Sequence, residues 1–490
     1  MKKTVVLYPG LAVSHFMPMM QLADVLLEEG YAVVVALIDV TNERNTTFAA
    51  AIDRAMASSS KLAATFHTLP RIRDPPTVTN DVNLLLGYFE IIRRYNEHLR
   101  ELLRSIPRQS VHAVVVDSLS NAALDVAAEL GVPAYSFFAS NASALAVCLQ
   151  LPWARAEGQP PSFKELGDAT VNFHGVPPMP ASHLIPEVLE DPGTEIYKAM
   201  MNSLSKNLEA GGILVNTFAS LEARAVAALK DPHFLAESRL RMPPVYCVGP
   251  LVEKAAETKE EHACDACLAW LDEQPELSVV FLCFGSVGSS NHSETQLKEI
   301  AVGLERSGQR FLWVVRAPLG DNPEREFGDK ADPDLQALLP EGFLERTRGR
   351  GLVVKLWAPQ VAVLQHKATG AFVTHCGWNS VLEGVMAGVP MLCWPLYAEQ
   401  KMNKVLMVEE LRIGVELAGW HQHGLVKAEE LEAKVRLVME AEEGEQLRAR
   451  VRAHKGHAAD MVWKDGGSSR VSFRQFLSDV VNVSPDRTLG

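Results

Sequence analysis

The stretch GAFVTHCGWNSVLEGVMAGVPMLCWP, residues 370–395, decides the fold class, because it joins two apolar runs through a small turn and an amphipathic run. The first run ends at His375, and Asn379 and Ser380 stand where the amphipathic run opens. A strand that enters a helix through such a turn leaves backbone N–H groups unpaired at the helix start, where an anion can be held. The order therefore predicts a strand–helix–strand unit with an anion site at its turn.

The side chains at this turn suit a phosphate group and a sugar. His375, Asn379 and Ser380 can donate hydrogen bonds to a diphosphate, and Glu383, about one turn into the predicted helix, can accept them from sugar hydroxyls. Each residue taken singly also has an ordinary explanation, since Ser and Asn are common N-caps and Glu is common on a solvated helix face. Only the combination predicts a ligand site.

The same alternation of apolar runs and amphipathic stretches extends over the chain. The runs rich in Val, Ile and Leu lie at 4–10, 31–39, 112–117, 132–138, 279–284, 310–316 and 351–359. Nearly continuous apolar strands alternating with helices indicate a parallel sheet that is covered on both faces. The sequence therefore predicts an α/β fold.

The chain divides at a charged stretch, VEKAAETKEEHACD, because the alternation stops there and then restarts. We expect two doubly wound, Rossmann-like domains, with an N-terminal domain at 1–251, a linker at 252–265 and a second domain at 266–464. The remaining residues, 465–490, read as a short loop and a terminal helix. Ligands of such folds bind outside the carboxyl ends of the strands, which predicts a site in a cleft between the two domains.

Composition excludes several classes of function. A chain of 490 residues is too long for one core, and its formal charge of −13 disfavours nucleic acid and anionic membranes as partners. The longest apolar runs are too short to span a bilayer, and the first residues read as a strand rather than a signal peptide. Its seven cysteines lie mostly in apolar runs, so we expect reduced thiols and a cytoplasmic protein. We also expect a monomer whose partners are small molecules.

A second strand–helix turn follows the run at 279–284, and it contains Gly285, Ser286 and Gly288. Ser293 and Gln296 then form a capping-box pattern at the start of a helix. The turn has neither the G-x-G-x-x-G spacing of a dinucleotide site nor the Lys-Ser/Thr of a P-loop. Its glycines still allow close approach of a phosphate.

The segment from Trp357 to Gln400, WAPQVAVLQHKATGAFVTHCGWNSVLEGVMAGVPMLCWPLYAEQ, closely resembles the signature box of the plant secondary-product UDP-glycosyltransferases, members of glycosyltransferase family 1. The resemblance extends to LVNTF at 214–218, VGPL at 248–251 and GGSSR at 466–470. It implies the GT-B architecture, in which two Rossmann-like domains face a cleft, and it implies that the C-terminal helix within 465–490 crosses back to the N-terminal domain. It also implies inverting transfer of a sugar, most often glucose, from a UDP-sugar to a flavonoid or another small phenolic acceptor.

The resemblance assigns donor-binding roles by position. Trp357 is expected to stack on uracil, a role that suits the large face of an indole, while Ala358 and Gln360 read the edge of the base. His375, Asn379, Ser380 and Ser286 are expected to hold the diphosphate, and Glu383 the ribose hydroxyls. The residues expected at the sugar are Trp378, Glu399 and Gln400, with Glu399 replacing the family's usual Asp.

The resemblance places the catalytic base in the N-terminal half, at His15, in a loop where the family's usual Gly-His is here Ser14-His15. A helix N-terminus disfavours imidazolium, which independently suits a neutral base. Asp117 ends the apolar run at 112–117 and is expected to orient His15 and stabilise the imidazolium that forms. For the acceptor we expect contacts with His15 itself, Phe16, Phe137 and Ala398.

No metal or other cofactor is expected, because helix N-termini can neutralise the departing diphosphate. An Asp-x-Asp triplet does occur, at Asp332 and Asp334, but it lies in a polar insert away from any predicted strand end. We attribute it to loop composition.

Three alternatives stay open at this stage. The same base can serve C-glycosylation of a flavonoid carbon, in place of transfer to a hydroxyl. A UDP-sugar epimerase and a non-catalytic UDP-sugar-binding protein can also use a donor site of this kind. The presence of both His15 and Asp117 disfavours the non-catalytic alternative.

Overall fold

The computed structural model describes residues 2–38, 46–57, 63–76, 84–154, 162–238, 240–253, 262–285, 292–318, 332–421, 424–458 and 462–482. The chain forms two compact units, which are described separately. Unit 1 comprises Met1–Val252 with Asp460–Gly490, and unit 2 comprises Glu253–Ala459. Within the described residues, no helix has both the length and the apolar character that a membrane crossing requires.

Unit 1 is built on a seven-stranded sheet in the order β3-β2-β1-β4-β5-β8-β9. Its described pairings are all parallel. The strands are β1 (Thr4–Tyr8), β2 (Ala32–Ile38), β3 (Thr65–Leu69), β4 (Val111–Asp117), β5 (Ala134–Phe138), β8 (Ile213–Val215) and β9 (Val245–Cys247). The chain order reverses between β1 and β4, which makes their carboxyl ends the topological switch point where ligands of such sheets bind.

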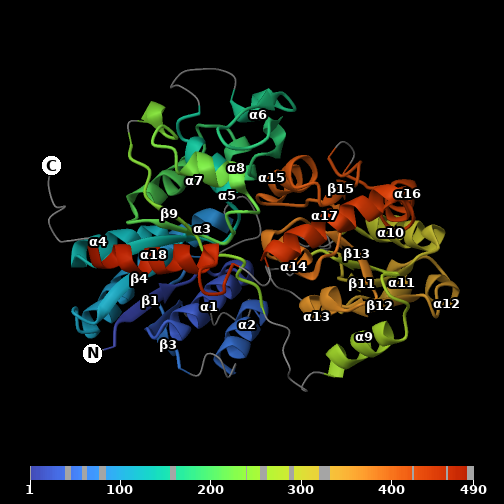
Figure 1. The fold of residues 1–490 in the computed structure, drawn as a ribbon, viewed down its shortest axis with the longest axis horizontal. Helices are drawn as coiled ribbons and strands as arrows, with labels where there is room; N and C mark the ends of the chain where they lie inside the picture. The colour runs from blue at the N-terminus through green and yellow to red at the C-terminus, as the bar shows by residue number, and fades with distance from the viewer. Residues whose placement is uncertain are drawn as a thin grey trace. The chain divides into compact units, whose positions relative to one another are not determined.

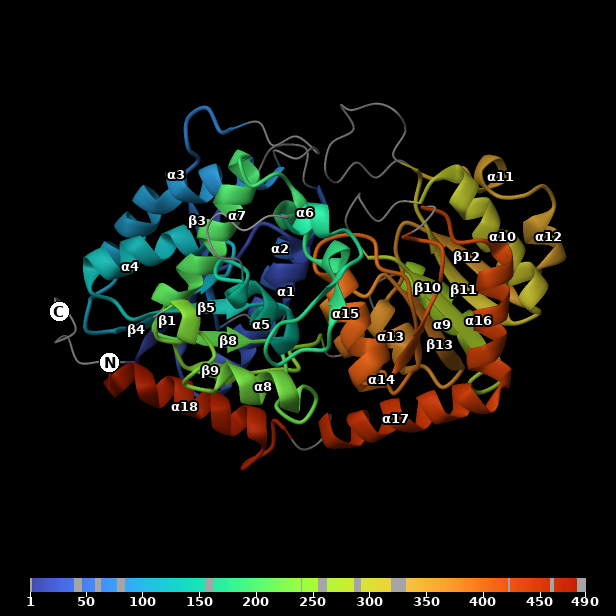
Figure 2. The same ribbon diagram turned by 90° about the horizontal axis from the view of Figure 1, so that it is seen from above.

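Helices cover both faces of this sheet because its side chains alternate between them. Val5 and Leu7 of β1 join a core with α1 (Val13–Glu28), α2 (Thr46–Ala57) and α18 (Ser468–Asn482). Val6 and Tyr8 join a second core with α3 (Leu84–Ser105) and α4 (Leu124–Leu130). Figure 2 shows α3 and α4 on one side of the strands and α18 on the other.

The remaining helices of unit 1 connect β5 to β8 and β8 to β9, and Figure 1 shows where most of them lie in the fold. They are α5 (Ala142–Gln150), α6 (Phe163–Leu166), α7 (Glu195–Lys206) and α8 (Ala223–Leu229), with the short strands β6 (Thr170–Val171) and β7 (Met179–Pro180). Glu222, just before α8, is fully buried, and its carboxylate accepts hydrogen bonds from the backbone N–H groups of Ala142 and Ser143. This contact holds the start of α5.

The terminal helix α18 packs on unit 1 although it follows unit 2 in the chain. Phe473 and Phe476 enter the core beside α1, and the Tyr246 hydroxyl donates to Asp479 at 2.8 Å. Arg470 pairs with Glu29, just past the end of α1, at 2.7 Å. Apolar burial and polar contacts together therefore hold this helix in unit 1.

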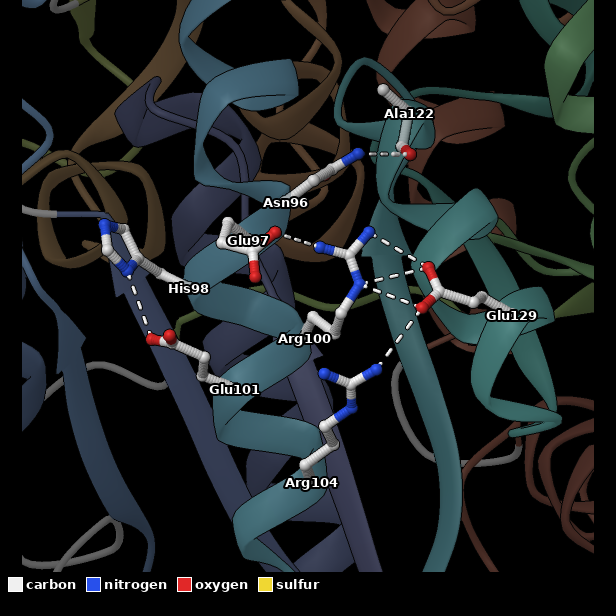
Figure 3. A network of polar contacts seen from close by, with 8 residues as sticks. All are labelled: Asn96, Glu97, His98, Arg100, Glu101, Arg104, Ala122 and Glu129. Carbon is white, nitrogen blue, oxygen red and sulfur yellow. Dashed lines mark hydrogen bonds and ion pairs between the residues drawn. The ribbon is translucent and has the colours of Figure 1, made fainter.

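Helices α3 and α4 are joined by a surface network of polar contacts (Figure 3). Arg100 of α3 donates to both carboxylate oxygens of Glu129, at 3.0 and 3.1 Å, and Arg104 reaches the same carboxylate. Asn96 donates to the backbone carbonyl of Ala122 at 2.9 Å. Exposed ion pairs stabilise little individually, but the set fixes α3 against the segment that follows β4.

Unit 2 has a six-stranded sheet in the order β12-β11-β10-β13-β14-β15, with parallel pairings throughout its described part. The strands are β10 (Val279–Cys283), β11 (Arg310–Val315), β12 (Gly351–Lys355), β13 (Thr369–Thr374), β14 (Met391–Cys393) and β15 (Gly414–Glu416). The reversal of order falls between β10 and β13. The switch point therefore lies beside the segment that predicted the fold.

The helices of unit 2 bury this sheet. They are α9 (His262–Asp272), α10 (Glu294–Ser307), α11 (Leu335–Leu338), α12 (Phe343–Arg346), α13 (Gln360–Gln365), α14 (Trp378–Ala387), α15 (Gln400–Val405) with a π-helical turn at Leu406–Glu410, α16 (Ala428–Glu440) and α17 (Glu442–Ala458). Val280, Leu282 and Trp313 are among the core residues. The α/β class with two Rossmann-like halves is confirmed, and α9 begins inside the segment treated above as a linker.

Candidate active site

A histidine and an aspartate meet at the switch point of unit 1. Asp117 is the last residue of β4, and His15 lies in the first turn of α1, directly after the neighbouring strand β1. His15 Nδ1 is 2.7 Å from Asp117 Oδ2, and the exposed fractions of the two side chains are 26% and 0%. Because a carboxylate only accepts hydrogen bonds, Nδ1 carries the proton and Nε2 is left with a lone pair. The pair has the arrangement of a general base and its orienting group.

The surrounding backbone fixes the carboxylate of Asp117. Its second oxygen, Oδ1, accepts a hydrogen bond from the Leu119 N–H at 3.0 Å. A Cβ atom at Gly10 would lie 3.0 Å from that oxygen, so only glycine lets the β1–α1 loop pass this close without displacing a neighbour. The helix α1 has no side-chain cap at Ala12, and its N-terminal dipole favours a neutral imidazole at His15.

The aromatic residues expected at the acceptor are not placed as the sequence analysis assumes. Phe16 and Phe137 are both fully buried in the core, and Phe16 packs edge-on against Phe48 with ring centroids 5.4 Å apart. Neither ring offers surface to a ligand. Phe138 and Ser140, at and just beyond the end of β5, are half-buried instead.

In unit 2, His375 follows β13 at the sheet edge and is only 6% exposed. Its Nδ1 is buried and has no hydrogen-bond partner among the described residues. Burial, and to a lesser extent the charge of Arg316, lowers the pKa of His375 to about 4, so the ring is neutral at neutral pH. Cβ atoms at Gly285 and Gly377 would lie 2.8 and 2.4 Å from Nε2, so these two glycines make room for the ring.

The residues predicted for the nucleoside also come together. Gln360, which opens α13, donates through Nε2 to Ser380 Oγ at 2.8 Å and to Glu383 Oε2 at 2.6 Å. Burial raises the pKa of Glu383 to about 7, and the Gln360 hydrogen bond partly opposes this. Trp357 is 45% exposed, whereas its neighbour Ala358 is buried. An exposed indole beside a buried polar cluster is suited to stacking on a planar base.

The residues predicted for the sugar differ in exposure. Gln400 is buried, and its Oε1 accepts hydrogen bonds from the backbone N–H groups of Leu396 and Tyr397, each at 2.9 Å. Glu399 accepts from Asn403 Nδ2 at 3.2 Å. Trp378 is 3% exposed, Asn379 is half-buried and Ala398 is exposed. Ser286 lies outside the described residues.

Three residues beside predicted donor contacts have left-handed backbone conformations although they are not glycine. Leu356 precedes Trp357 with a φ of 65°, Cys376 follows His375 with 64°, and Ala398 precedes Glu399 with 52°. Such conformations cost free energy, and they persist where the surrounding structure imposes them, often at functional sites. At Cys376 the carbonyl is held by Asn403 Nδ2 at 2.9 Å.

Two polar residues near these edges were not predicted from the sequence. Arg316 directly follows β11, and its charge contributes to the lowered pKa of His375. A cation at the end of an apolar strand beside a predicted anion site was a usable signal in the sequence. Tyr88, on α3, has its hydroxyl 2.9 Å from Ser120 Oγ. No sequence pattern linked it to residues so distant in the chain.

The Asp-x-Asp triplet has local partners. Asp332 forms an ion pair with Lys355 at 2.8 Å, and the Asp334 carboxylate caps α11 by accepting from the Gln336 and Ala337 N–H groups. In the described part of the chain, no group of three or more His, Cys, Asp or Glu side chains is arranged to hold a metal ion.

Comparison with known proteins finds one matching family model and many similar chains. The model described as "UDP-glucoronosyl and UDP-glucosyl transferase" matches residues 235–442. Anthocyanidin 5,3-O-glucosyltransferase from a Rosa hybrid cultivar is 38% identical, over 96% of this chain and 97% of that protein. Phloretin 2'-O-glucosyltransferase from Pyrus communis is 42% identical, over 85% of this chain and 86% of that protein.

The fold also matches solved structures. Phytolacca americana UGT2, solved in complex with UDP-2-fluoro-glucose and pterostilbene, superposes with a TM-score of 0.83 at 31% identity. The match covers 98% of this chain and 100% of that one. The likeness therefore extends across both units of this chain.

Proposed function

This chain belongs to the UDP-glycosyltransferase family, and from that premise we propose that it transfers glucose from UDP-glucose to a hydroxyl group of a small aromatic acceptor such as a flavonoid, with inversion at the anomeric carbon. The observation that carries this proposal is the contact of 2.7 Å between His15 Nδ1 and Asp117 Oδ2 at the switch point of unit 1. A protein that only bound UDP-sugars has no need of an oriented base.

The reaction is a single displacement. His15 Nε2 takes the proton of the acceptor hydroxyl, and the oxygen forms a bond to the anomeric carbon while the bond from that carbon to the diphosphate breaks. The electron pair of the broken bond leaves with UDP. The imidazolium that forms at His15 is stabilised by the buried Asp117 carboxylate. General-base catalysis of this kind contributes about 10²- to 10⁴-fold to the rate.

The donor roles follow the resemblance and are supported by the placement of the side chains in unit 2. Trp357 stacks on uracil, with Ala358 and Gln360 at the edge of the base. Glu383 accepts from the ribose hydroxyls, and the buried Nδ1 of His375 is an unused polar atom beside the N-terminus of α14. Asn379, Ser380 and Ser286 complete the diphosphate contacts, and the residues assigned to glucose are Trp378, Glu399 and Gln400.

The choice of acceptor and sugar rests on the named relatives. Anthocyanidin and phloretin appear in the names of two of them, both called glucosyltransferases, and pterostilbene was bound by a third. All three are phenolic compounds. Because Phe16 and Phe137 are buried, we place the acceptor near His15 and the half-buried Phe138 of unit 1.

We further propose that transfer requires no metal ion, since the dipole at the N-terminus of α14, next to His375 in the chain, favours the negative charge of the diphosphate. Full activity in EDTA is the expected outcome.

We also propose a cytoplasmic monomer. The described cysteines with a free thiol are buried, which supports a reducing compartment, and size-exclusion chromatography with light scattering tests the monomer.

The experiment that tests the function combines the purified protein with UDP-glucose and a panel of flavonoids and follows UDP release and product mass. We expect a product heavier by one hexose, which acid hydrolyses because the linkage is to oxygen. An acid-stable product would indicate a carbon linkage. UDP release without any glycosylated product would contradict transfer.

A further inference from the structure

Tyr88 reaches from α3 to the loops that carry the proposed base and its partner. Its hydroxyl is 2.9 Å from Ser120 Oγ, in the segment that leaves β4 after Asp117. A Cβ atom at Gly10, in the loop between β1 and α1, would lie 3.0 Å from the same hydroxyl, so this loop passes directly beside it. One hydroxyl group therefore contacts both loops.

The same hydroxyl lies close to Asp117 itself. A Cβ atom at Gly10 would be 3.0 Å from both the Tyr88 hydroxyl and Asp117 Oδ1, so the two oxygens face one point. Burial, and next the charge of Asp117, raises the pKa of Tyr88 well above its ordinary value. The group therefore stays a neutral hydroxyl at any working pH, so its contribution is geometric and does not involve proton transfer.

The helix that presents Tyr88 is itself held in place. Asn96 of α3 donates to the Ala122 carbonyl at 2.9 Å, and Arg100 binds the Glu129 carboxylate of α4 (Figure 3). Both contacts are to the segment that continues from Ser120. Because α3 is fixed by these contacts, the Tyr88 hydroxyl that it carries can restrain the loops that follow β1 and β4.

We propose that Tyr88 is a positioning residue that holds the loop of His15 and the loop of Asp117 at the separation their hydrogen bond requires. This inference rests on the proposed function for its catalytic consequence. Tyr88 does not touch the reacting atoms in this role. Its effect is to keep the carboxylate aligned on Nδ1 so that Nε2 faces the acceptor hydroxyl.

The test replaces Tyr88 with phenylalanine, which removes only the oxygen. Tyr8→Phe is the matched control, because the Tyr8 hydroxyl is also buried in unit 1 but has no hydrogen-bond partner among the described residues. We expect Tyr88→Phe to lower kcat about tenfold, with the acceptor KM unchanged, and Tyr8→Phe to keep the wild-type kcat.

A second arm separates positioning from a general loss of structure. If Tyr88 acts through Asp117, adding Tyr88→Phe to Asp117→Asn should change the residual kcat by less than about twofold. A full tenfold loss in that background would overturn the proposal. So would an acceptor KM that rises in Tyr88→Phe while kcat stays constant, since that result would make Tyr88 an acceptor contact.

The third arm does not depend on turnover, so it separates failure of this inference from failure of the proposed function. Amide hydrogen exchange is measured at His15 and Leu119, whose N–H groups bind the Ala12 carbonyl and Asp117 Oδ1. We expect Tyr88→Phe, but not Tyr8→Phe, to speed exchange at both residues severalfold. Unchanged exchange at both residues would overturn the positioning role of Tyr88 even if the wild type transfers glucose.

Discussion

The two units each place a histidine at the carboxyl edge of a parallel sheet, but they surround it differently. His15 in unit 1 is partly exposed and paired with the Asp117 carboxylate. His375 in unit 2 is buried, has an unused Nδ1, and has its pKa lowered to about 4. The first environment stabilises a ring that takes up a proton, and the second opposes protonation. The comparison shows that local charge and burial decide which histidine can act as a base.

The largest expected effect comes from removing the charge beside His15. In Asp117→Asn the side chain keeps its size but no longer stabilises an imidazolium, and we expect kcat to fall about 10²- to 10⁴-fold. The Kd for UDP-glucose should stay at its wild-type value, since Asp117 belongs to unit 1. Steady-state kinetics and calorimetry measure the two quantities. Loss of donor binding in this variant would contradict the claim that the His15–Asp117 pair serves catalysis while unit 2 binds the donor.

The next effect tests the donor edge of unit 2. Trp357→Ala should raise the Kd for UDP-glucose about tenfold, because stacking on a base is worth about 1–3 kcal/mol. The side chain is 45% exposed, so the melting temperature should change little. Trp357→Phe, which keeps an aromatic face, should recover much of the affinity. An alanine variant with wild-type affinity would remove Trp357 from the donor site.

A smaller effect is expected at Gly10. A methyl group there would lie 3.0 Å from both Asp117 Oδ1 and the Tyr88 hydroxyl, so the Asp117 side chain, and with it the His15–Asp117 hydrogen bond, must shift. We expect Gly10→Ala to lower kcat severalfold at an unchanged donor Kd, since overpacking a close contact costs about 1–3 kcal/mol. Gly456→Ala, in α17, shows the effect of an added methyl group alone, because the added atom meets nothing within 4 Å and the backbone there is not left-handed. Equal kcat values in the two variants would contradict the close contact.

The smallest effect is the pH dependence that Glu383 gives to donor binding. Burial raises its pKa from an ordinary 4.5 to about 7, so the carboxylate that accepts ribose hydroxyls ionises as the pH rises through 7. We expect UDP-glucose to bind a fewfold more tightly at pH 8 than at pH 6, and Glu383→Gln to abolish that trend. His375 should not contribute, because its pKa of about 4 lies below this window.

The raised pKa of Glu383 has the opposite effect on stability, which falls as the pH rises. A carboxyl group whose pKa is raised on folding contributes stability that is complete below pH 4.5 and lost as the pH rises through about 7. The melting temperature of Glu383→Gln relative to wild type should therefore increase between pH 5 and pH 8. A difference that stays constant over this range would show that Glu383 has an ordinary pKa.

Much of the fold could be predicted from the sequence because parallel strands that are buried on both faces consist of nearly continuous apolar residues. The runs at 4–10 and 279–284 contain β1 and β10, and the run at 112–117 covers all of β4 except its first residue. The family resemblance is confirmed by the relatives. The edge position of His15, Asp117 and His375 follows from the same rule, since each residue ends or follows such a run.

Side-chain direction could not be predicted in this way. Phe16 follows the proposed base in the chain and Phe137 pairs with Asp117 on the neighbouring strand, yet both rings pack into the core, because α1 and β5 turn those positions inward. Proximity in sequence to a site residue does not give the face on which a neighbour lies.

Contacts that depend on tertiary packing were also beyond the sequence. Tyr88 approaches Asp117 only because α3 packs over the end of β4, and nothing in the local pattern of the helix signals this. The environments of the two histidines likewise depend on tertiary packing. Burial and the nearby Arg316 set the pKa of His375, and these are properties of the folded chain.

The most direct test of this account measures kcat and the Kd for UDP-glucose in His15→Ala and His375→Asn, side by side with wild type. We predict that His15→Ala lowers kcat about 10²- to 10⁴-fold at an unchanged Kd, whereas His375→Asn weakens donor binding about tenfold or more. Wild-type turnover in His15→Ala, or wild-type donor affinity in His375→Asn, would contradict the division of roles between the two histidines.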